Sequence, residues 1–126
     1  MPNTNRVLIV EDHQDTLKSL FIILTDAGYS VLTAENGAQA VDLLGHGLHP
    51  RLILLDLMLP RVSGWEVLKF LREDPGLREV PVVVLTARDA VDAHAVAVDA
   101  VLTKPIESAT LLETIERVLG SASISR

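Results

Sequence analysis

The sequence predicts an α/β fold, a three-layer sandwich built on a five-stranded parallel sheet. Short apolar runs recur along the chain, and each is followed by an amphipathic segment with helical spacing. The runs are apolar throughout, without alternation, which is typical of strands buried on both faces of a sheet. Strands that alternate with helices favour parallel pairing through right-handed crossovers.

The first half of the chain contains two strand–helix units and a third strand. Residues 7–10 form a continuous apolar run, and residues 29–34 form a weaker one. Helical spacing between these two strands predicts a helix that ends at Gly28, and a short helix is expected after Gly37. The apolar residues that predict the two helices are Leu17, Leu20, Phe21, Leu24, Ala38, Val41 and Leu44.

The rest of the chain continues the same pattern. Strands are expected at residues 52–55, 80–85 and 100–103, and helices around residues 67–71, 87–98 and 108–119. Pro81 interrupts the fourth strand near its start. Residues 120–126 are small and polar, so we expect a frayed end or the start of a linker there. The chain is therefore expected to be one domain, residues 1–126, with its core at about residues 6–119.

The composition of the chain argues against several classes of function. The 126 residues carry a net charge of −6, which argues against a nucleic-acid-binding surface. There are no cysteines, which excludes disulfides and thiolate metal sites and suits a reducing cytoplasm. No apolar stretch approaches the roughly 20 residues that a membrane-spanning helix needs. We expect a cytoplasmic protein that contacts neither membrane nor nucleic acid.

Polar residues stand where the predicted strands end. Glu11 and Asp12 follow the first strand, and Asp56 follows the third. Thr86 and Lys104 follow the fourth and the fifth. Ligands of such folds bind beyond the carboxyl ends of the strands, so we expect these five side chains to meet at one edge of the sheet.

This set of side chains suits phosphoryl chemistry. Clustered carboxylates repel one another, so they take up protons or recruit a cation. Carboxylate oxygens suit Mg²⁺, which binds a few of them together with water and a phosphate. Asp56 would then be a nucleophile that forms an aspartyl phosphate. Lys104 would neutralise one phosphoryl oxygen and Thr86 would donate a hydrogen bond to another.

Each of these residues also has an ordinary structural interpretation when it is taken alone. An Asp at a strand end is often the N-cap of the next helix, and Glu11 and Asp12 could cap in the same way. Lys104 alone would be a solvated lysine, and Thr86 a turn hydroxyl. Their joint placement at four strand ends favours the functional interpretation. The four histidines have no metal-ligand spacing, and His13 is the only one near the site. Trp65 is expected to pack at the start of the third helix.

With these residues identified, the chain resembles a response-regulator receiver domain, the phospho-acceptor module of two-component signalling. The matching segments are residues 7–12, 52–60 and 82–87, together with Gly64 and Lys104-Pro105. The resemblance covers about residues 6–119. It implies a flavodoxin-like (βα)5 fold with strand order 2-1-3-4-5. It also implies that the Lys104–Pro105 peptide is cis.

The resemblance implies roles for individual residues. Asp56 would accept a phosphoryl group from a partner histidine kinase or phosphotransfer protein, and Thr86 and Lys104 would contact that group. Met58 and Arg88 would tune its lifetime. Beyond self-phosphorylation and autodephosphorylation no enzymatic activity is implied. The signal would pass to a downstream protein target or an output domain, from a monomer or weak dimer.

The resemblance also implies a magnesium site. Asp12 and Asp56 would bind Mg²⁺ directly, with the backbone carbonyl of Met58 as a third ligand, and Glu11 would act largely through water.

Two departures from the family pattern leave an alternative open. The family usually carries Tyr or Phe three residues before the conserved lysine, where this chain has Val101. The segment from Thr86 to Lys104 is also shorter than usual by about four residues, roughly one helical turn. The alternative is a receiver-like interaction module whose switching is atypical or independent of phosphate.

Two further functions are disfavoured. A phosphatase with an Asp nucleophile would need a second Asp where Met58 stands. Nucleotide binding is disfavoured because neither GxGxxG nor a P-loop pattern is present.

Overall fold

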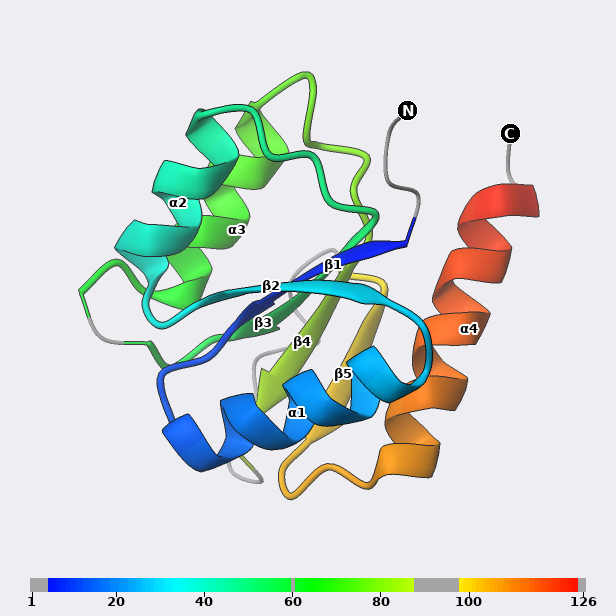
Figure 1. Ribbon diagram of the computed structural model, residues 1–126. Coiled ribbons are helices and arrows are strands. Elements are labelled where there is room, and N and C mark those ends of the chain that lie inside the picture. The colour runs from blue at the N-terminus through cyan, green and yellow to red at the C-terminus, as the bar shows by residue number, and fades with distance from the viewer. Residues whose placement is uncertain (1–4, 60, 88–97, 125–126) are drawn as a thin grey trace.

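The computed structural model describes residues 5–59, 61–87 and 98–124 (Figure 1). The helix expected over residues 87–98 and the tuning residue Arg88 lie outside the described residues. The shortening of that segment therefore stays a sequence observation.

Five strands form one parallel sheet in the order β2-β1-β3-β4-β5, which confirms the predicted topology. The strands are β1 (Arg6–Val10), β2 (Ser30–Ala34), β3 (Leu52–Asp56), β4 (Val82–Thr86) and β5 (Ala100–Thr103). The central strands β3 and β4 are buried along their whole length. The edge strand β2 is mostly exposed, so the expectation of burial on both faces is wrong for this strand.

Helices cover both faces of the sheet (Figure 1). Helices α2 (Gly37–Gly45) and α3 (Gly64–Glu73) lie on one face, and α1 (Gln14–Asp26) and α4 (Ser108–Ile124) lie on the other. Helices α1, α2 and α3 begin at side-chain caps that satisfy free backbone N–H groups. His13 caps α1, Asn36 caps α2, and Ser63 forms a capping box with Glu66 at α3. After α1 the chain turns at Gly28, whose φ of 100° is a conformation that glycine favours.

Alternate side chains of each central strand belong to different cores. On β3, Ile53 and Leu55 pack beneath α2 and α3, whereas Leu52 and Leu54 pack beneath α1 and α4. All four are completely buried. Because side chains alternate across a sheet, a strand with a helix layer on each face needs apolar residues at every position. This explains the unbroken apolar runs of the sequence.

Several element boundaries differ from the prediction, and the differences at β4 and α4 have a physical reason. Strand β4 begins at Val82 instead of residue 80, because Pro81 has no N–H to offer a sheet. The Pro81 carbonyl still accepts a hydrogen bond of 3.0 Å from the Ile53 N–H. Helix α4 continues beyond the predicted end at Leu119 as far as Ile124. Gly120 is the only weak helix former in that extension, and one glycine does not end a helix that is already formed.

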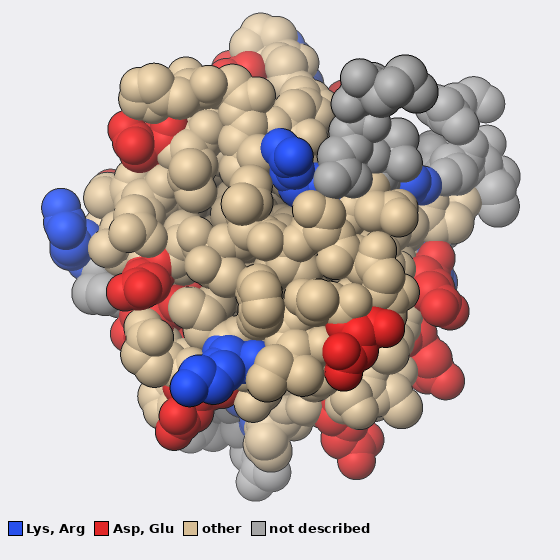
Figure 2. Space-filling model, viewed as in Figure 1, with Lys and Arg blue, Asp and Glu red and all other residues tan. Residues whose placement is uncertain are grey.

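Charge is dispersed on the face of the molecule shown in Figure 2. Basic side chains stand singly there, with acidic ones nearby, around a broad uncharged centre.

Among the described residues, no helix is both long enough and apolar enough to span a bilayer.

Candidate functional site

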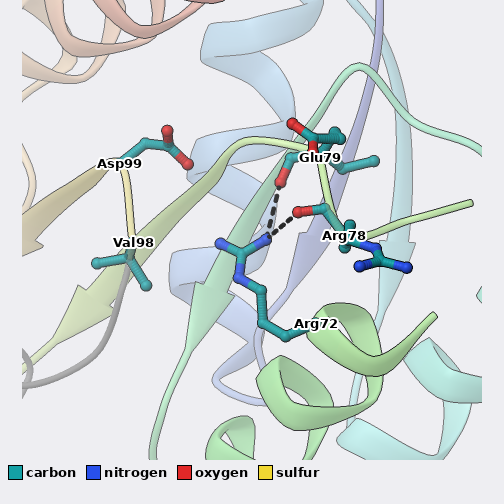
Figure 3. Close-up of a pocket in the computed structure, with 6 residues that line it drawn as sticks. Arg72, Arg78, Glu79, Val98 and Asp99 are labelled. Atoms are coloured by element: carbon teal, nitrogen blue, oxygen red, sulfur yellow. Dashed lines mark hydrogen bonds between the residues drawn. The ribbon is translucent and has the colours of Figure 1, made fainter. Parts of the chain in front are cut away.

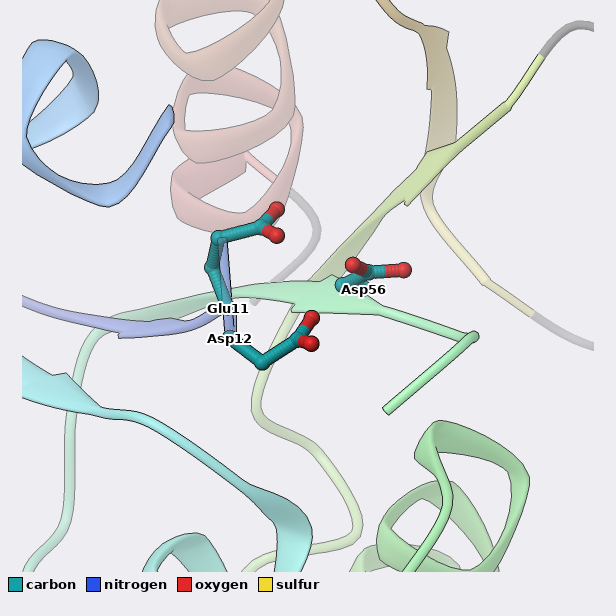
Figure 4. A group of neighbouring side chains, drawn as sticks. All are labelled: Glu11, Asp12 and Asp56. Atoms are coloured by element: carbon teal, nitrogen blue, oxygen red, sulfur yellow. The ribbon is translucent and has the colours of Figure 1, made fainter. Parts of the chain in front are cut away.

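Three carboxylates meet at the carboxyl ends of the central strands. Glu11 and Asp12 follow β1, and Asp56 is the last residue of β3. One carboxylate oxygen from each lies within 4.8 Å of the others. Figure 4 shows the three side chains extending toward a common space. Glu11 and Asp56 are buried, whereas Asp12 is exposed, so the group is open to solvent on the Asp12 side.

Lys104 brings a positive charge to this group from the end of β5. Its Nζ lies 2.8 Å from Glu11 Oε1 and 3.0 Å from Asp56 Oδ2. The contact with Asp56 is a hydrogen bond, whereas Glu11 Oε1 has no partner with hydrogen-bond geometry. The Lys104–Pro105 peptide that follows is cis, as the sequence resemblance implies. One ammonium group therefore balances two buried carboxylates.

This arrangement shifts the pKa of both Glu11 and Lys104. Burial raises the pKa of Glu11 and the charge of Asp56 adds to the effect, although Lys104 and the His13 N–H oppose it. Burial alone would lower the pKa of Lys104. Its close contacts with Glu11 and Asp56, together with their negative charges, outweigh burial and raise that pKa above 10.5. Lys104 is therefore firmly protonated at neutral pH.

The second oxygen of Asp56 is held by the chain that follows it. Asp56 Oδ1 accepts a 2.9 Å hydrogen bond from the Met58 N–H. The Met58 side chain is 68% exposed beside the acidic group. Thr86, at the end of the neighbouring strand β4, is buried, and its hydroxyl donates a 3.2 Å hydrogen bond to the Ala87 carbonyl. Asp56 is thus held at both oxygens, at Oδ1 by the Met58 N–H and at Oδ2 by Lys104.

The caps show that the acidic residues do not serve as helix N-caps. His13 accepts the capping hydrogen bond from the Thr16 N–H, and Ser63 caps α3. Glu11 and Asp56 therefore have no capping role to account for their burial. The His13 backbone N–H also donates a 3.1 Å hydrogen bond to Glu11 Oε2, a contact that the sequence analysis did not identify.

Trp65 and Val101 lie outside the acidic group. Trp65 lies in the first turn of α3, but its side chain is 38% exposed, so it packs less fully than expected. Val101 lies on β5 beside Val84 and packs, partly buried, against the core beneath α2 and α3.

A pocket of about 370 Å³ lies at the opposite edge of the sheet, near the amino ends of β4 and β5. Figure 3 shows the Arg72 guanidinium turned toward the backbone there. It donates hydrogen bonds to the carbonyls of Arg78, at 2.9 Å, and Val80, at 3.4 Å. The Val82 N–H donates to Asp99 Oδ2 at 2.8 Å. The Arg72 contacts join α3 to the segment before β4, and the Asp99 contact joins the start of β4 to the residue before β5.

Comparison with known proteins agrees with the fold. Residues 7–116 match the response regulator receiver domain family. The polar-differentiation response regulator DivK of Brucella ovis is 37% identical over 123 residues, which cover 94% of this chain and 99% of DivK.

Solved structures give the same result. The receiver domain of a signal transduction histidine kinase from Syntrophus aciditrophicus is 32% identical, with a TM-score of 0.85 over 93% of this chain and 91% of that one. The receiver domain of a sensor histidine kinase from Pseudomonas aeruginosa PAO1 is 28% identical, with a TM-score of 0.85 over 92% and 98%. That structure has a magnesium ion coordinated in its active site cleft.

Proposed function

The chain belongs to the response regulator receiver domain family of two-component systems, and from this premise we propose that Asp56 is its phosphoryl acceptor. One observation carries the proposal: the buried Asp56 carboxylate contacts the Lys104 ammonium and lies close to two further carboxylates. Such a set of charges suits phosphoryl transfer, which depends mainly on positioning and charge neutralisation. The same set disfavours the alternative of a module that does not use phosphate.

We further propose that the acidic group binds Mg²⁺. Asp12 and Asp56 would be direct ligands together with the Met58 backbone carbonyl, and Glu11 would act through water. The residues fit a hard divalent cation, since one oxygen from each of three carboxylates lies within 4.8 Å of the others and Asp12 is open to solvent. Bound Mg²⁺ would supply charge neutralisation between the Asp56 carboxylate and an incoming phosphate.

In the proposed reaction a carboxylate oxygen of Asp56 attacks the phosphorus of a phosphohistidine on the donor protein. A P–O bond forms and the P–N bond breaks, with its electron pair returning to the imidazole. Lys104, which already contacts Asp56, is placed to donate to a phosphoryl oxygen. The Thr86 hydroxyl would turn away from the Ala87 carbonyl and donate a hydrogen bond to a second phosphoryl oxygen. Attack by water on the acyl phosphate restores Asp56 and releases phosphate, at a rate that Met58 and Arg88 would tune.

The proposed partners follow from this chemistry. The phosphoryl donor is a histidine kinase or phosphotransfer protein, and the recipient of the signal is a downstream protein or an output domain. We propose a cytoplasmic location, which suits a cysteine-free chain, and a monomer or weak dimer.

The proposal is tested with a small acyl phosphate as donor. The protein is incubated with the donor with and without Mg²⁺, and covalent phosphate is measured by intact mass. We expect one phosphoryl group per chain with Mg²⁺ and none in Asp56→Asn. Asp26→Asn, at an exposed position of α1, is the matched control and should label normally. Absence of labelling in the unmodified protein with Mg²⁺ would refute the proposal.

A further inference from the structure

We propose that Gly37, in the first turn of α2, is a positioning residue for the described part of the β3–α3 loop (residues 57–59 and 61–63) and thereby sets the affinity of the acidic group for Mg²⁺. The inference rests on the proposed function, because the β3–α3 loop carries Met58, whose carbonyl is a proposed ligand. Gly37 is far from Asp56 in the sequence and has no side chain to offer. Its contribution is the close approach of two backbones.

The contact between Gly37 and Val62 leaves no room for a side chain at residue 37. A Cβ atom added to Gly37 would overlap the Val62 carbonyl oxygen. It would also lie 2.6 Å from the Val62 carbonyl carbon and 2.9 Å from its Cβ. Because the first two atoms belong to the backbone, no change of side-chain rotamer relieves the overlap. Alanine at this position therefore has to move either α2 or the β3–α3 loop.

The start of α2 is held firmly in place. Asn36 Oδ1 accepts a 2.8 Å hydrogen bond from the Gln39 N–H, and Gln39 Oε1 accepts one of 2.7 Å from the Glu35 N–H. Just before this turn, the Ala34 carbonyl accepts a 3.0 Å hydrogen bond from the Glu11 N–H. These bonds tie the start of α2 to the end of β1, so the displacement is expected to fall on the β3–α3 loop.

The β3–α3 loop passes a displacement on to Asp56. At its far end, the Gly64 N–H donates a 3.2 Å hydrogen bond to the Leu57 carbonyl. A Cβ on Gly64 would collide with the Asp56 carbonyl oxygen and Leu57 Cα, so α3 starts directly against the end of β3. The loop between these two close contacts contains Met58, whose N–H holds Asp56 Oδ1 at 2.9 Å. Movement at Val62 is therefore expected to disturb both Met58 and Asp56.

The expected consequence is weaker Mg²⁺ binding. Changes to groups that orient metal ligands without touching the metal typically cost about 10–100-fold in affinity. We expect Gly37→Ala to raise the dissociation constant for Mg²⁺ by about tenfold, the low end of that range.

Urea unfolding at a series of Mg²⁺ concentrations tests the inference. Trp65 is the only tryptophan, so its fluorescence reports unfolding, and the stability gained with added Mg²⁺ gives the dissociation constant. This gain separates positioning from simple destabilisation, because a purely structural defect lowers stability equally with and without the metal. Gly45→Ala is the matched control, since it lies in the same helix and an added Cβ there meets nothing within 4 Å.

A dissociation constant for Mg²⁺ about tenfold higher in Gly37→Ala, with that of Gly45→Ala unchanged, supports the inference. An unchanged Mg²⁺ affinity in folded Gly37→Ala overturns it. If Gly37→Ala does not fold, Asn36→Ala loosens the same turn without adding bulk and should weaken Mg²⁺ binding severalfold, and an unchanged affinity there overturns the inference equally. Absence of any Mg²⁺ effect in the unmodified protein would instead count against the proposed function.

Discussion

Replacing Lys104 with methionine tests the electrostatic balance of the site most severely. Lys104→Met keeps an unbranched side chain of similar length but removes the ammonium group. Glu11 is fully buried and the Asp56 side chain is 5% exposed, so neither carboxylate gains much water in compensation. Two ionised carboxylates would then face one another without a counter-charge, and the folded state should be strongly destabilised.

The magnitude follows from burial. Removing one partner of a buried ion pair costs about 3–5 kcal/mol. The Lys104 side chain is 26% exposed, so solvent already screens part of its interaction. The added methionine also regains some packing. We therefore expect a loss of about 2–3 kcal/mol in the free energy of unfolding at neutral pH, below the range for full burial.

Urea unfolding in the presence of a chelator measures this loss without interference from metal.

The pH dependence of the free energy of unfolding gives a second, independent check. The pKa of Lys104 is raised above 10.5, so its stabilisation is fully present below pH 10.5 and is lost as the pH rises through the folded-state value. The pKa of Glu11 is raised above 4.5, so burial of the ionised form costs stability at neutral pH, and this cost is relieved as the pH falls.

The difference between the unmodified protein and Lys104→Met should therefore be largest near neutral pH. It should shrink as Glu11 takes up a proton and again as Lys104 loses one. Lys69→Met, at an exposed position of α3, is the control and should change stability by less than about 0.5 kcal/mol. A Lys104→Met protein as stable as the control at pH 7 would refute the reasoning.

Three further outcomes are expected. Asp12→Asn removes one charge from the acidic group, so it should raise the free energy of unfolding measured without metal. It should also abolish the further stabilisation that added Mg²⁺ gives. If Mg²⁺ stabilises Asp12→Asn as much as the unmodified protein, the proposed ligand set is contradicted. Ser63→Ala removes the cap of α3 and its capping box, and should lower the free energy of unfolding by about 1 kcal/mol in a urea titration. Gly64→Ala forces the start of α3 from the end of β3 and should cost about 1–3 kcal/mol, whereas Gly120→Ala, with nothing within 4 Å of an added Cβ, should cost no stability.

Much of the fold was predictable because its strongest signals are local. The unbroken apolar runs of β1, β3 and β4 reflect a helix layer on each face of the sheet, and parallel strands bring their carboxyl ends to one edge. That is why Asp56 and Lys104, 48 residues apart, could be expected to meet, and the structure brings them into contact. The exposure of β2 was not predictable in this way, because an edge position depends on the order of strands as well as their composition.

Finer features of the site have no sequence signal. Glu11 and Asp12 are adjacent and chemically alike, and their carboxylates approach the same space, yet Glu11 is buried and Asp12 is exposed. The close approach of Gly37 to Val62 also cannot be predicted from the sequence. Glycine occurs at helix starts for many reasons, and Val62 lies in a loop far from Gly37 in the sequence. Such contacts depend on how two finished elements pack.

The central claim is that Asp56 carries the phosphoryl group, and one chemical measurement tests it most directly. Borohydride reduces an aspartyl phosphate to homoserine, so the protein is treated with a small acyl phosphate and Mg²⁺, reduced, digested and mapped by mass spectrometry. We expect homoserine at position 56, and only in samples that contained Mg²⁺. Homoserine at Asp12 or another carboxylate instead of position 56 would contradict it.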